Sequence, residues 1–282
     1  MRIDLHAHST CSDGTDAPSV VMSRAAVAGL DVVALTDHDT VAGHAEAAAA
    51  LPAGLTLVPG AEVSCVVDGV SVHVLAYLFD PLSPALASEL DLLRTDRSRR
   101  GEAMVARLRG LGADVTFARV LELAAGGAVG RPHVARALVE AGVVPDVASA
   151  FSDEWIGPRG RAYVDKYALD PFHAVSLIND AGGVAVFAHP GAVKRGRVVS
   201  DAVIAALADA GLAGIEVDHP DHGPETRASL RTLATSLGLL VTGSSDDHGS
   251  LTGHRLGCET TAPDVWAALR ERATGAAPVV AA

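Results

Sequence analysis

Residues 1–14, Met-Arg-Ile-Asp-Leu-His-Ala-His-Ser-Thr-Cys-Ser-Asp-Gly, decide how the rest of the chain is interpreted. Polar and apolar residues alternate from Arg2 to His8, which is the pattern of a β-strand with one buried face. The alternation places His6 and His8 on the same face, where two imidazoles can reach one metal ion. Asp13 follows in a Ser-Asp-Gly turn and can bring a carboxylate to a neighbouring ion. His-x-His alone fits an ordinary polar strand end equally well, so the rest of the chain has to settle the matter.

The composition limits the class of protein. With 282 residues, of which 49% are hydrophobic, the chain can bury the core of one α/β barrel or of two smaller domains. A net charge of −12 argues against a broad surface for nucleic acid, and bound divalent cations would be needed to attract phosphate. Cys11, Cys65 and Cys258 show no Cys-x-x-Cys spacing. The chain has neither a signal peptide nor an apolar run of about 20 residues, so we expect a cytoplasmic protein with no membrane contact and no obligate protein partner.

Strand and helix patterns alternate along most of the chain. The expected strands are residues 2–8, 31–36, 55–58, 70–79, 183–188, 213–217 and 239–242. Between residues 81 and 171 this alternation stops and the pattern becomes helical. We therefore predict an α/β barrel formed by residues 1–80 and 172–272, with an inserted helical subdomain at 81–171. Residues 273–282 are small and uncharged, which predicts a disordered tail.

Unusual polar residues gather where the expected strands end. These residues are His6, His8, His38, Glu62, His189, His219, Asp246 and His248. In a closed parallel barrel the carboxyl ends of the strands share one mouth, which is where barrel active sites are built. The candidate metal ligands are His6, His8, Asp13, His38, Glu62, His73, His189, Asp246 and His248. Six imidazoles and three carboxylates suit zinc, manganese or iron, and nine donors are enough for two or three ions.

Six short motifs occur in order along the chain. They are His6-Ala-His8-Ser, Ser12-Asp13-Gly14, Thr36-Asp37-His38, Pro59-Gly60-x-Glu62, His189-Pro190 and Ser245-Asp246-x-His248-Gly249. The set resembles the PHP (polymerase and histidinol phosphatase) family, which implies a distorted (βα)7 TIM-like barrel with two or three metals at its mouth. Gly130-Arg131-Pro132-His133 and His219-Pro220-Asp221-His222 resemble the bacterial branch that acts on nucleoside 3′,5′-bisphosphates and nucleotides. Some members of that branch also trim RNA from its 5′ end.

The resemblance implies a division of the ligands among three ions. The first ion would be held by His6, His8, Glu62 and Asp246, the second by Asp13, His38 and His248, and the third by Glu62, His73 and His189. Asp37 and Asp39 are expected to orient ligand imidazoles rather than bind metal. Asp247 departs from the family pattern, because an apolar or aromatic residue usually stands there.

The expected reaction is metal-assisted hydrolysis of a phosphomonoester, in which a metal-bound hydroxide attacks phosphorus in line. Arg131 is our candidate for gripping a phosphate, with Arg159 or Arg161 as a second contact. The alternative for Arg131 is a structural salt bridge between insertion and barrel. His133, His219 or His222 could protonate the leaving group or contact substrate, and a structural role is an equal alternative for His133 and His222.

Several other functions fit part of the sequence. Histidinol-phosphate phosphatase is the main rival within the family. An amidohydrolase barrel also begins with His-x-His, but it does not call for Asp13, His38 or the closing Asp-x-His. A haloacid-dehalogenase-type phosphatase, phosphorylated at Asp37, would leave most of the histidines unexplained. A non-catalytic metal-binding scaffold is expected to have lost several ligands, whereas all nine are present here.

Overall fold

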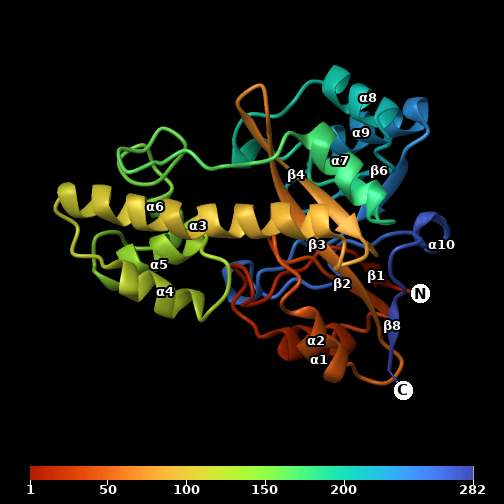
Figure 1. The fold of residues 1–282 in the computed structure, drawn as a ribbon, viewed down its shortest axis with the longest axis horizontal. Helices are drawn as coiled ribbons and strands as arrows, with labels where there is room; N and C mark the ends of the chain where they lie inside the picture. Colours follow the sequence, from red (N-terminus) through yellow and green to blue (C-terminus); the bar gives the residue numbers. More distant parts are fainter. Residues whose placement is uncertain (282) are drawn as a thin grey trace.

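Seven strands of one curved, eight-stranded sheet follow one another in the order β1 to β7 (Figure 1). The computed structural model describes residues 1–281, except for the side chain of Arg195. The strands are β1 (Ile3–Asp4), β2 (Val32–Leu35), β3 (Thr56–Val67), β4 (Val70–Tyr77), β5 (Val184–Phe187), β6 (Gly214–Asp218) and β7 (Leu240–Gly243). A parallel bridge from Ala7 to Asp247 brings the two edges of the sheet together. The predicted α/β fold, a distorted TIM-like barrel, is therefore confirmed.

The distortion lies in β4, which runs antiparallel to both β3 and β5, whereas the other neighbouring pairs from β1 to β7 are parallel. We expected the third strand to stop at Val58 and Glu62 to follow its end. That expectation was wrong, because β3 continues to Val67 and turns back as a hairpin. The turn residues Asp68 and Gly69 have φ angles of 51° and 70°, the two positive values that a tight type I′ turn requires. Glu62 therefore lies in the middle of a strand.

Ten helices complete the described part of the chain. They are α1 (Pro18–Val27), α2 (His44–Ala49), α3 (Pro84–Gly110), α4 (Phe117–Ala124), α5 (Arg131–Glu140), α6 (Val147–Ala150), α7 (Pro171–Asp180), α8 (Asp201–Asp209), α9 (Pro224–Leu237) and α10 (Pro263–Arg272). Five of them begin with proline at the first position, where the missing N–H costs nothing and the fixed φ favours a helix. These prolines mark the starts of five helices in the sequence.

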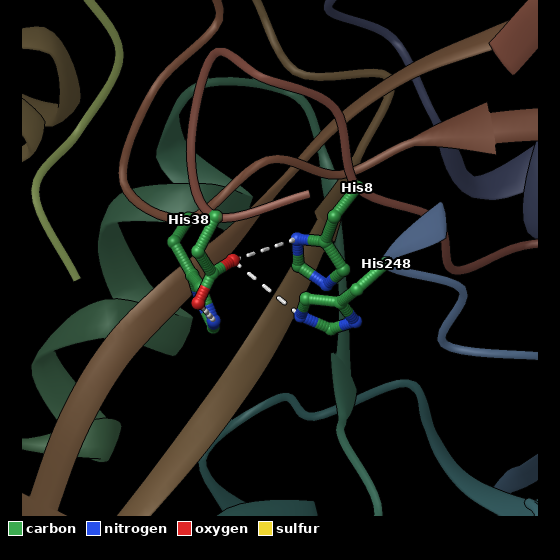
Figure 2. Close-up of side chains that lie close together, drawn as sticks. His8, His38 and His248 are labelled. Atoms are coloured by element: carbon green, nitrogen blue, oxygen red, sulfur yellow. Dashed lines mark ion pairs between the residues drawn. The ribbon is translucent and has the colours of Figure 1, made fainter. Parts of the chain in front are cut away.

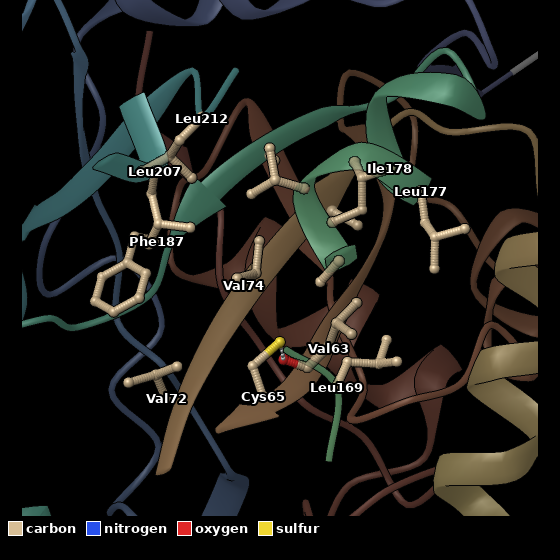
Figure 3. Packing of buried hydrophobic residues seen from close by; sticks show 14 of the residues in the cluster. Val63, Cys65, Val72, Val74, Leu169, Leu177, Ile178, Phe187, Leu207 and Leu212 are labelled. Atoms are coloured by element: carbon tan, nitrogen blue, oxygen red, sulfur yellow. Dashed lines mark hydrogen bonds between the residues drawn. The ribbon is translucent and has the colours of Figure 1, made fainter. Parts of the chain in front are cut away.

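The 27-residue helix α3 links the barrel to the other helices of the insertion (Figure 1). Leu86, Leu90 and Leu93 in its first half join the barrel core around β3, β4 and α7, part of which is drawn in Figure 3. Met104 and Leu108 in its second half belong to a separate apolar cluster with α4, α5 and α6. One rigid helix therefore fixes the insertion to the barrel, although the division into two units itself stays a prediction.

The end of the chain differs from the expected disordered tail. Val279–Val280 forms β8, which pairs antiparallel with Thr56 and Leu57 of β3. The amide of Ala276 also donates to the carbonyl of Leu78. The pairing covers an otherwise open edge of β3, which is the physical reason why an uncharged tail can be held in place; residue 282 lies outside the described residues. None of the described helices is long and apolar enough to cross a membrane.

Candidate metal centre

The nine predicted ligands converge at one mouth of the barrel. They arrive from the segment after β1 (His6, His8 and Asp13), from the end of β2 (His38), from β3 and β4 (Glu62 and His73), from the end of β5 (His189) and from the segment after β7 (Asp246 and His248). Seven are buried, and His73 and His248 are partly buried. Such a gathering of ionisable side chains is costly unless the groups are paired or bind metal.

Four ligand atoms enclose a space of atomic size. Nε2 of His6 lies 3.1 Å from Nε2 of His8, and each lies 3.2 Å from Oε2 of Glu62. Oδ1 of Asp246 lies 3.4 Å from the first imidazole and 3.1 Å from the second. A tetrahedral ion with ligand distances of about 2.0–2.1 Å separates its ligand atoms by about 3.3–3.4 Å. The four atoms therefore have the spacing of a first coordination shell.

The two oxygens of Glu62 face different groups of histidines. Oε2 belongs to the first cage and also lies 3.0 Å from Nδ1 of His38. Oε1 lies 2.6 Å from Nδ1 of His73 and 3.0 Å from Nε2 of His189. A carboxylate in this position could bridge two ions, which is how two-metal sites hold their ions a few ångströms apart.

A second group surrounds Asp13. Oδ1 of Asp13 lies 3.4 Å from Nε2 of His248 and 4.0 Å from Nδ1 of His8, and Oδ2 lies 3.8 Å from Nε2 of His38. Figure 2 shows the three imidazoles of this group turned toward one another, with dashed lines for the ion pairs. His38 contacts both this group and Glu62, so it lies between two of the three ligand sets that the resemblance implies.

Observations beyond the distances show that these residues fit metal ions. Oδ1 of Asp13 and Nδ1 of His38 are buried and face charged neighbours, but neither makes a well-aligned hydrogen bond to a described residue, which is costly in a protein interior. His189 and Asp246 hold left-handed φ angles of 31° and 49°, and such strain concentrates at functional sites. The mixture of imidazole nitrogen and carboxylate oxygen is the donor set of zinc, manganese and iron sites.

The electrostatics keep two of the carboxylates and His73 in a form that can bind cations. Burial alone would raise the pKa of Glu62, but the surrounding imidazoles hold it well below its usual range. Asp13 behaves in the same way, because His38 and His248 outweigh its burial and lower its pKa. Burial lowers the pKa of His73 to about 3, although Glu62 opposes this shift. These two carboxylates are therefore ionised and His73 is neutral, as ligands must be. Burial would lower the pKa of His6 and of His8, but the carboxylates of Glu62 and Asp246 raise both, that of His8 to about 10, so these two imidazoles must release a proton when a cation binds.

Glu216, which was not predicted from the sequence, lies beneath the candidate ligands and contacts His6 and His189. Its side chain is fully buried on β6, with Oε1 3.1 Å from Nδ1 of His6. The hydroxyl of Ser244 donates to Oε1, and the backbone amide of His189 donates to Oε2 at 2.8 Å. A glutamate inside the apolar run of residues 213–217 was the available signal, since a buried acid requires partners.

Asp37 and Asp39 form hydrogen bonds with serine residues next to the ligands. Asp37 accepts hydrogen bonds from the backbone amide and hydroxyl of Ser9 and from the hydroxyl of Ser12. Asp39 accepts from Ser64 and pairs with Arg97 at 2.5 Å. The hydroxyl of Ser12, which donates to Asp37, lies 3.4 Å from Nδ1 of His8, so Asp37 can orient that imidazole through Ser12. The orienting role of Asp39 stays a prediction.

Asp247, the departure from the family pattern, points into the loop that follows the site. Its carboxylate accepts hydrogen bonds from the backbone amides of Gly249 and Arg255 and from the hydroxyl of Thr252. Its backbone carbonyl accepts from the amide of His8 at 2.9 Å. The extra acid therefore organises the loop that carries two ligands and does not face the cage.

Two of the three candidate acid–base histidines have both ring nitrogens occupied. Nδ1 of His222 lies 2.8 Å from the carbonyl of Val217, and its Nε2 accepts from the amide of Gly191. Nδ1 of His219 accepts from the amide of Asp221, which leaves the proton on Nε2, 3.3 Å from Oδ2 of Asp246. Both rings therefore support the site, and neither is free to donate a proton to substrate.

The arginines predicted to hold phosphate divide into two classes. Arg131 lies over the ring of Phe151 at 5.2 Å. It forms no ion pair within the described residues, so the alternative of a structural salt bridge is not observed. Arg159 is 84% exposed and pairs with Asp153 in its own loop. Arg161 is also exposed, and no contact brings either of these two to the described ligands.

Cations from α3 and from the segment before α7 gather beside Arg131. We call Arg97, Arg100, Arg131 and Lys166 the insertion cations. Their charges influence one another, and those of Arg97 and Arg131 also act on Asp13. Burial together with the neighbouring Arg97 lowers the pKa of Lys166 to about 8. Such a concentration of positive charge next to ligand carboxylates favours a bound anion.

Known proteins resemble the chain in sequence and in structure. The model of the PHP domain matches residues 4–120. The 3′,5′-nucleoside bisphosphate phosphatase of Chromobacterium violaceum is 35% identical over 277 residues, which cover 96% of this chain and 97% of the relative. The 5′-3′ exoribonuclease Rnm of Salmonella typhimurium is 32% identical and covers 87% of this chain and 84% of its own.

A solved structure from Bifidobacterium adolescentis superimposes with a TM-score of 0.90, at 37% identity and 96% coverage of both chains. That protein is assigned provisionally as a metal-dependent phosphoesterase. The likeness extends over the insertion as well as the barrel, because nearly the whole of each chain is covered. Together with the histidine and carboxylate cages at the barrel mouth, these matches show that the chain belongs to the PHP family and is a metal-dependent hydrolase of phosphoester bonds.

Proposed function

We propose that the protein is a nucleotide phosphatase that hydrolyses a phosphomonoester of a nucleoside 3′,5′-bisphosphate or a nucleoside monophosphate. The observation that carries the proposal is the adjacency of two features: the ligand cages of the barrel and the insertion cations. One phosphate group can be hydrolysed at the cages while a second one is held by positive charge a short distance away. The names of the Chromobacterium and Salmonella relatives point to the same substrate class.

We assign metal-binding and phosphate-binding roles to different residues. His6, His8, Glu62 and Asp246 would hold the first ion, and the groups around Asp13 and His73 would hold the others. When bound, such ions supply Lewis acidity and a nucleophilic hydroxide near neutral pH. Arg131 has no carboxylate partner in the described structure, so its guanidinium N–H groups can donate hydrogen bonds to a phosphate.

A phosphate-release screen with added manganese tests the proposal. It compares adenosine 3′,5′-bisphosphate, AMP, histidinol phosphate and a 5′-phosphorylated oligonucleotide, with an amide substrate for the amidohydrolase alternative. We expect the highest kcat/KM on the bisphosphate. Dominant turnover of histidinol phosphate would overturn the nucleotide assignment, and absence of any turnover in metal-loaded protein would favour a non-catalytic scaffold. If RNA were the main substrate, the oligonucleotide would lead and its affinity would fall steeply with salt.

Replacing Arg131 by alanine is expected to weaken substrate binding more than it slows the chemical step. A lost charge-assisted contact to phosphate removes about 1.5–3 kcal/mol, so KM should rise by about 10- to 100-fold with little change in kcat. Steady-state kinetics with the bisphosphate measure both constants. Arg159→Ala is the matched control, since that side chain is exposed and pairs within its own loop. Unchanged KM in the Arg131 variant would reject its role.

The charge of Lys166 predicts how binding of the second phosphate depends on pH. A lysine whose pKa is lowered to about 8 is protonated below that pH and loses its charge above it. The KM for adenosine 3′,5′-bisphosphate should therefore rise between about pH 7.5 and 9.5, whereas the KM for AMP should change much less over the same range. Lys166→Arg, which stays charged, should remove the rise. An identical pH dependence in this variant and in the wild type would show that Lys166 does not contact the phosphate.

A further inference from the structure

A cavity of about 250 Å³ lies beside the metal centre and is not explained by the ligands or by the insertion cations. One wall is the loop after β1, with Thr10, Gly14 and Thr15, and the other is formed by α4 and α5, with Leu123 and His133. Its volume is below the roughly 300–1,000 Å³ of sites for drug-sized ligands. The cavity therefore suits a single sugar or a group of similar size.

The cavity borders the segment that carries the ligand Asp13. Gly14, which lines the cavity, follows that ligand directly in the chain. Gly130, at the start of α5, approaches the same carboxylate so closely that a Cβ built on it would lie 3.4 Å from both Cβ and Oδ2 of Asp13. The cavity therefore lies next to the ligand group around Asp13.

His133 presents a defined hydrogen-bond donor to this cavity. The ring is 2% exposed, and its Nδ1 accepts a hydrogen bond from the backbone amide of Gly130 at 3.0 Å. An imidazole that accepts at Nδ1 carries its proton on Nε2. Nε2 makes no hydrogen bond within the described residues, whereas both nitrogens of His219 and of His222 are engaged.

We propose that the cavity receives the leaving alcohol of the ester, a ribose hydroxyl of the nucleoside, and that Nε2–H of His133 donates a hydrogen bond to the leaving oxygen. This inference rests on the proposed function for the identity of the alcohol, but not for the role of the histidine. The bond from phosphorus to the ester oxygen breaks as the bond to the attacking water oxygen forms. The leaving oxygen takes up the proton that the water loses, by way of solvent. His133 keeps its own proton, because giving it up would create an imidazolate next to Asp13.

The experiment separates a leaving-group role from a structural one. His133→Leu removes the donor, and His133→Gln keeps both a carbonyl that can accept from Gly130 and an amide that can donate. Both variants are measured with an alkyl phosphate (AMP or histidinol phosphate) and with 4-nitrophenyl phosphate, whose leaving group needs little stabilisation. Loss of a donor to a developing negative charge lowers kcat by roughly 10²-fold.

We expect His133→Leu to lose about that much on the alkyl ester and less than about threefold on the aryl ester, and His133→Gln to recover part of the loss. His173→Leu, an exposed histidine on α7, is the matched control and should leave the ratio of the two rates unchanged. Equal losses on both esters, or equal behaviour of the leucine and glutamine variants, would overturn the inference. If histidinol phosphate were cleaved and nucleotides were not, the proposed function would fail while this test of His133 would still apply.

Discussion

Glu62→Gln is expected to abolish activity almost completely, with a fall in kcat/KM of at least about 10³-fold. One oxygen of this carboxylate belongs to the cage of His6 and His8, and the other faces His73 and His189. The substitution preserves size but removes the negative charge and one acceptor, so at least two ion positions lose affinity at once. Added manganese should not restore the rate, because no other described carboxylate occupies this position between the two groups.

Metal content and thermal unfolding distinguish this explanation from a folding defect. Elemental analysis of protein purified without chelator should show fewer ions in the variant. Wild-type protein gains about 2.7 kcal/mol of stability at a metal concentration one hundred times its Kd, and the variant should gain much less. Glu271→Gln on the exposed side of α10 is the control. Equal metal content in variant and wild type would refute the bridging role of Glu62.

Most elements were predictable from the sequence because their signals are local. Four helices begin with a proline, at Pro18, Pro84, Pro171 and Pro224, and short apolar runs mark β2, β5 and β7. The hairpin of β3 and β4 carried the equally local signal Asp68-Gly69, which predicts a tight turn. It was overlooked because Pro59-Gly60 looked like the end of a strand, whereas these residues lie within β3, where the pairing partner changes from β2 to β4.

The convergence of the nine candidate ligands could be predicted because barrel topology brings strand ends together whatever the details of packing. The insertion cations could not, because they depend on contacts between distant segments. Arg97 pairs with Asp39, 58 positions earlier in the chain. Helical periodicity on an arginine-rich helix does not show which arginine meets a buried carboxylate. Composition favours a solvated face for all of them, which is correct for Arg94 and Arg99.

The second large effect is expected for Glu216→Gln, which should weaken metal binding by about 10- to 100-fold while leaving every ligand in place. The carboxylate of Glu216 lies 3.1 Å from Nδ1 of His6. A carboxylate can only accept there, so His6 keeps its proton on Nδ1 and turns the lone pair of Nε2 toward the cage. A glutamine amide can donate instead, which would shift the proton of His6 to Nε2 and remove a ligand lone pair from the cage.

The comparison with Glu62→Gln makes this prediction specific. A weakened but intact cage refills when the metal concentration is raised, so excess manganese should restore most of the rate in the Glu216 variant and little in the Glu62 variant. Isothermal titration calorimetry, in which metal is added to chelator-treated protein, measures the affinities directly. Ser244→Ala is the companion variant, because it removes one donor to Glu216 without altering the carboxylate that faces His6, and its affinity should fall less. If the Glu216 variant binds manganese as tightly as the wild type, the tautomer of His6 is set by the cage itself and Glu216 has a purely structural role in the barrel floor.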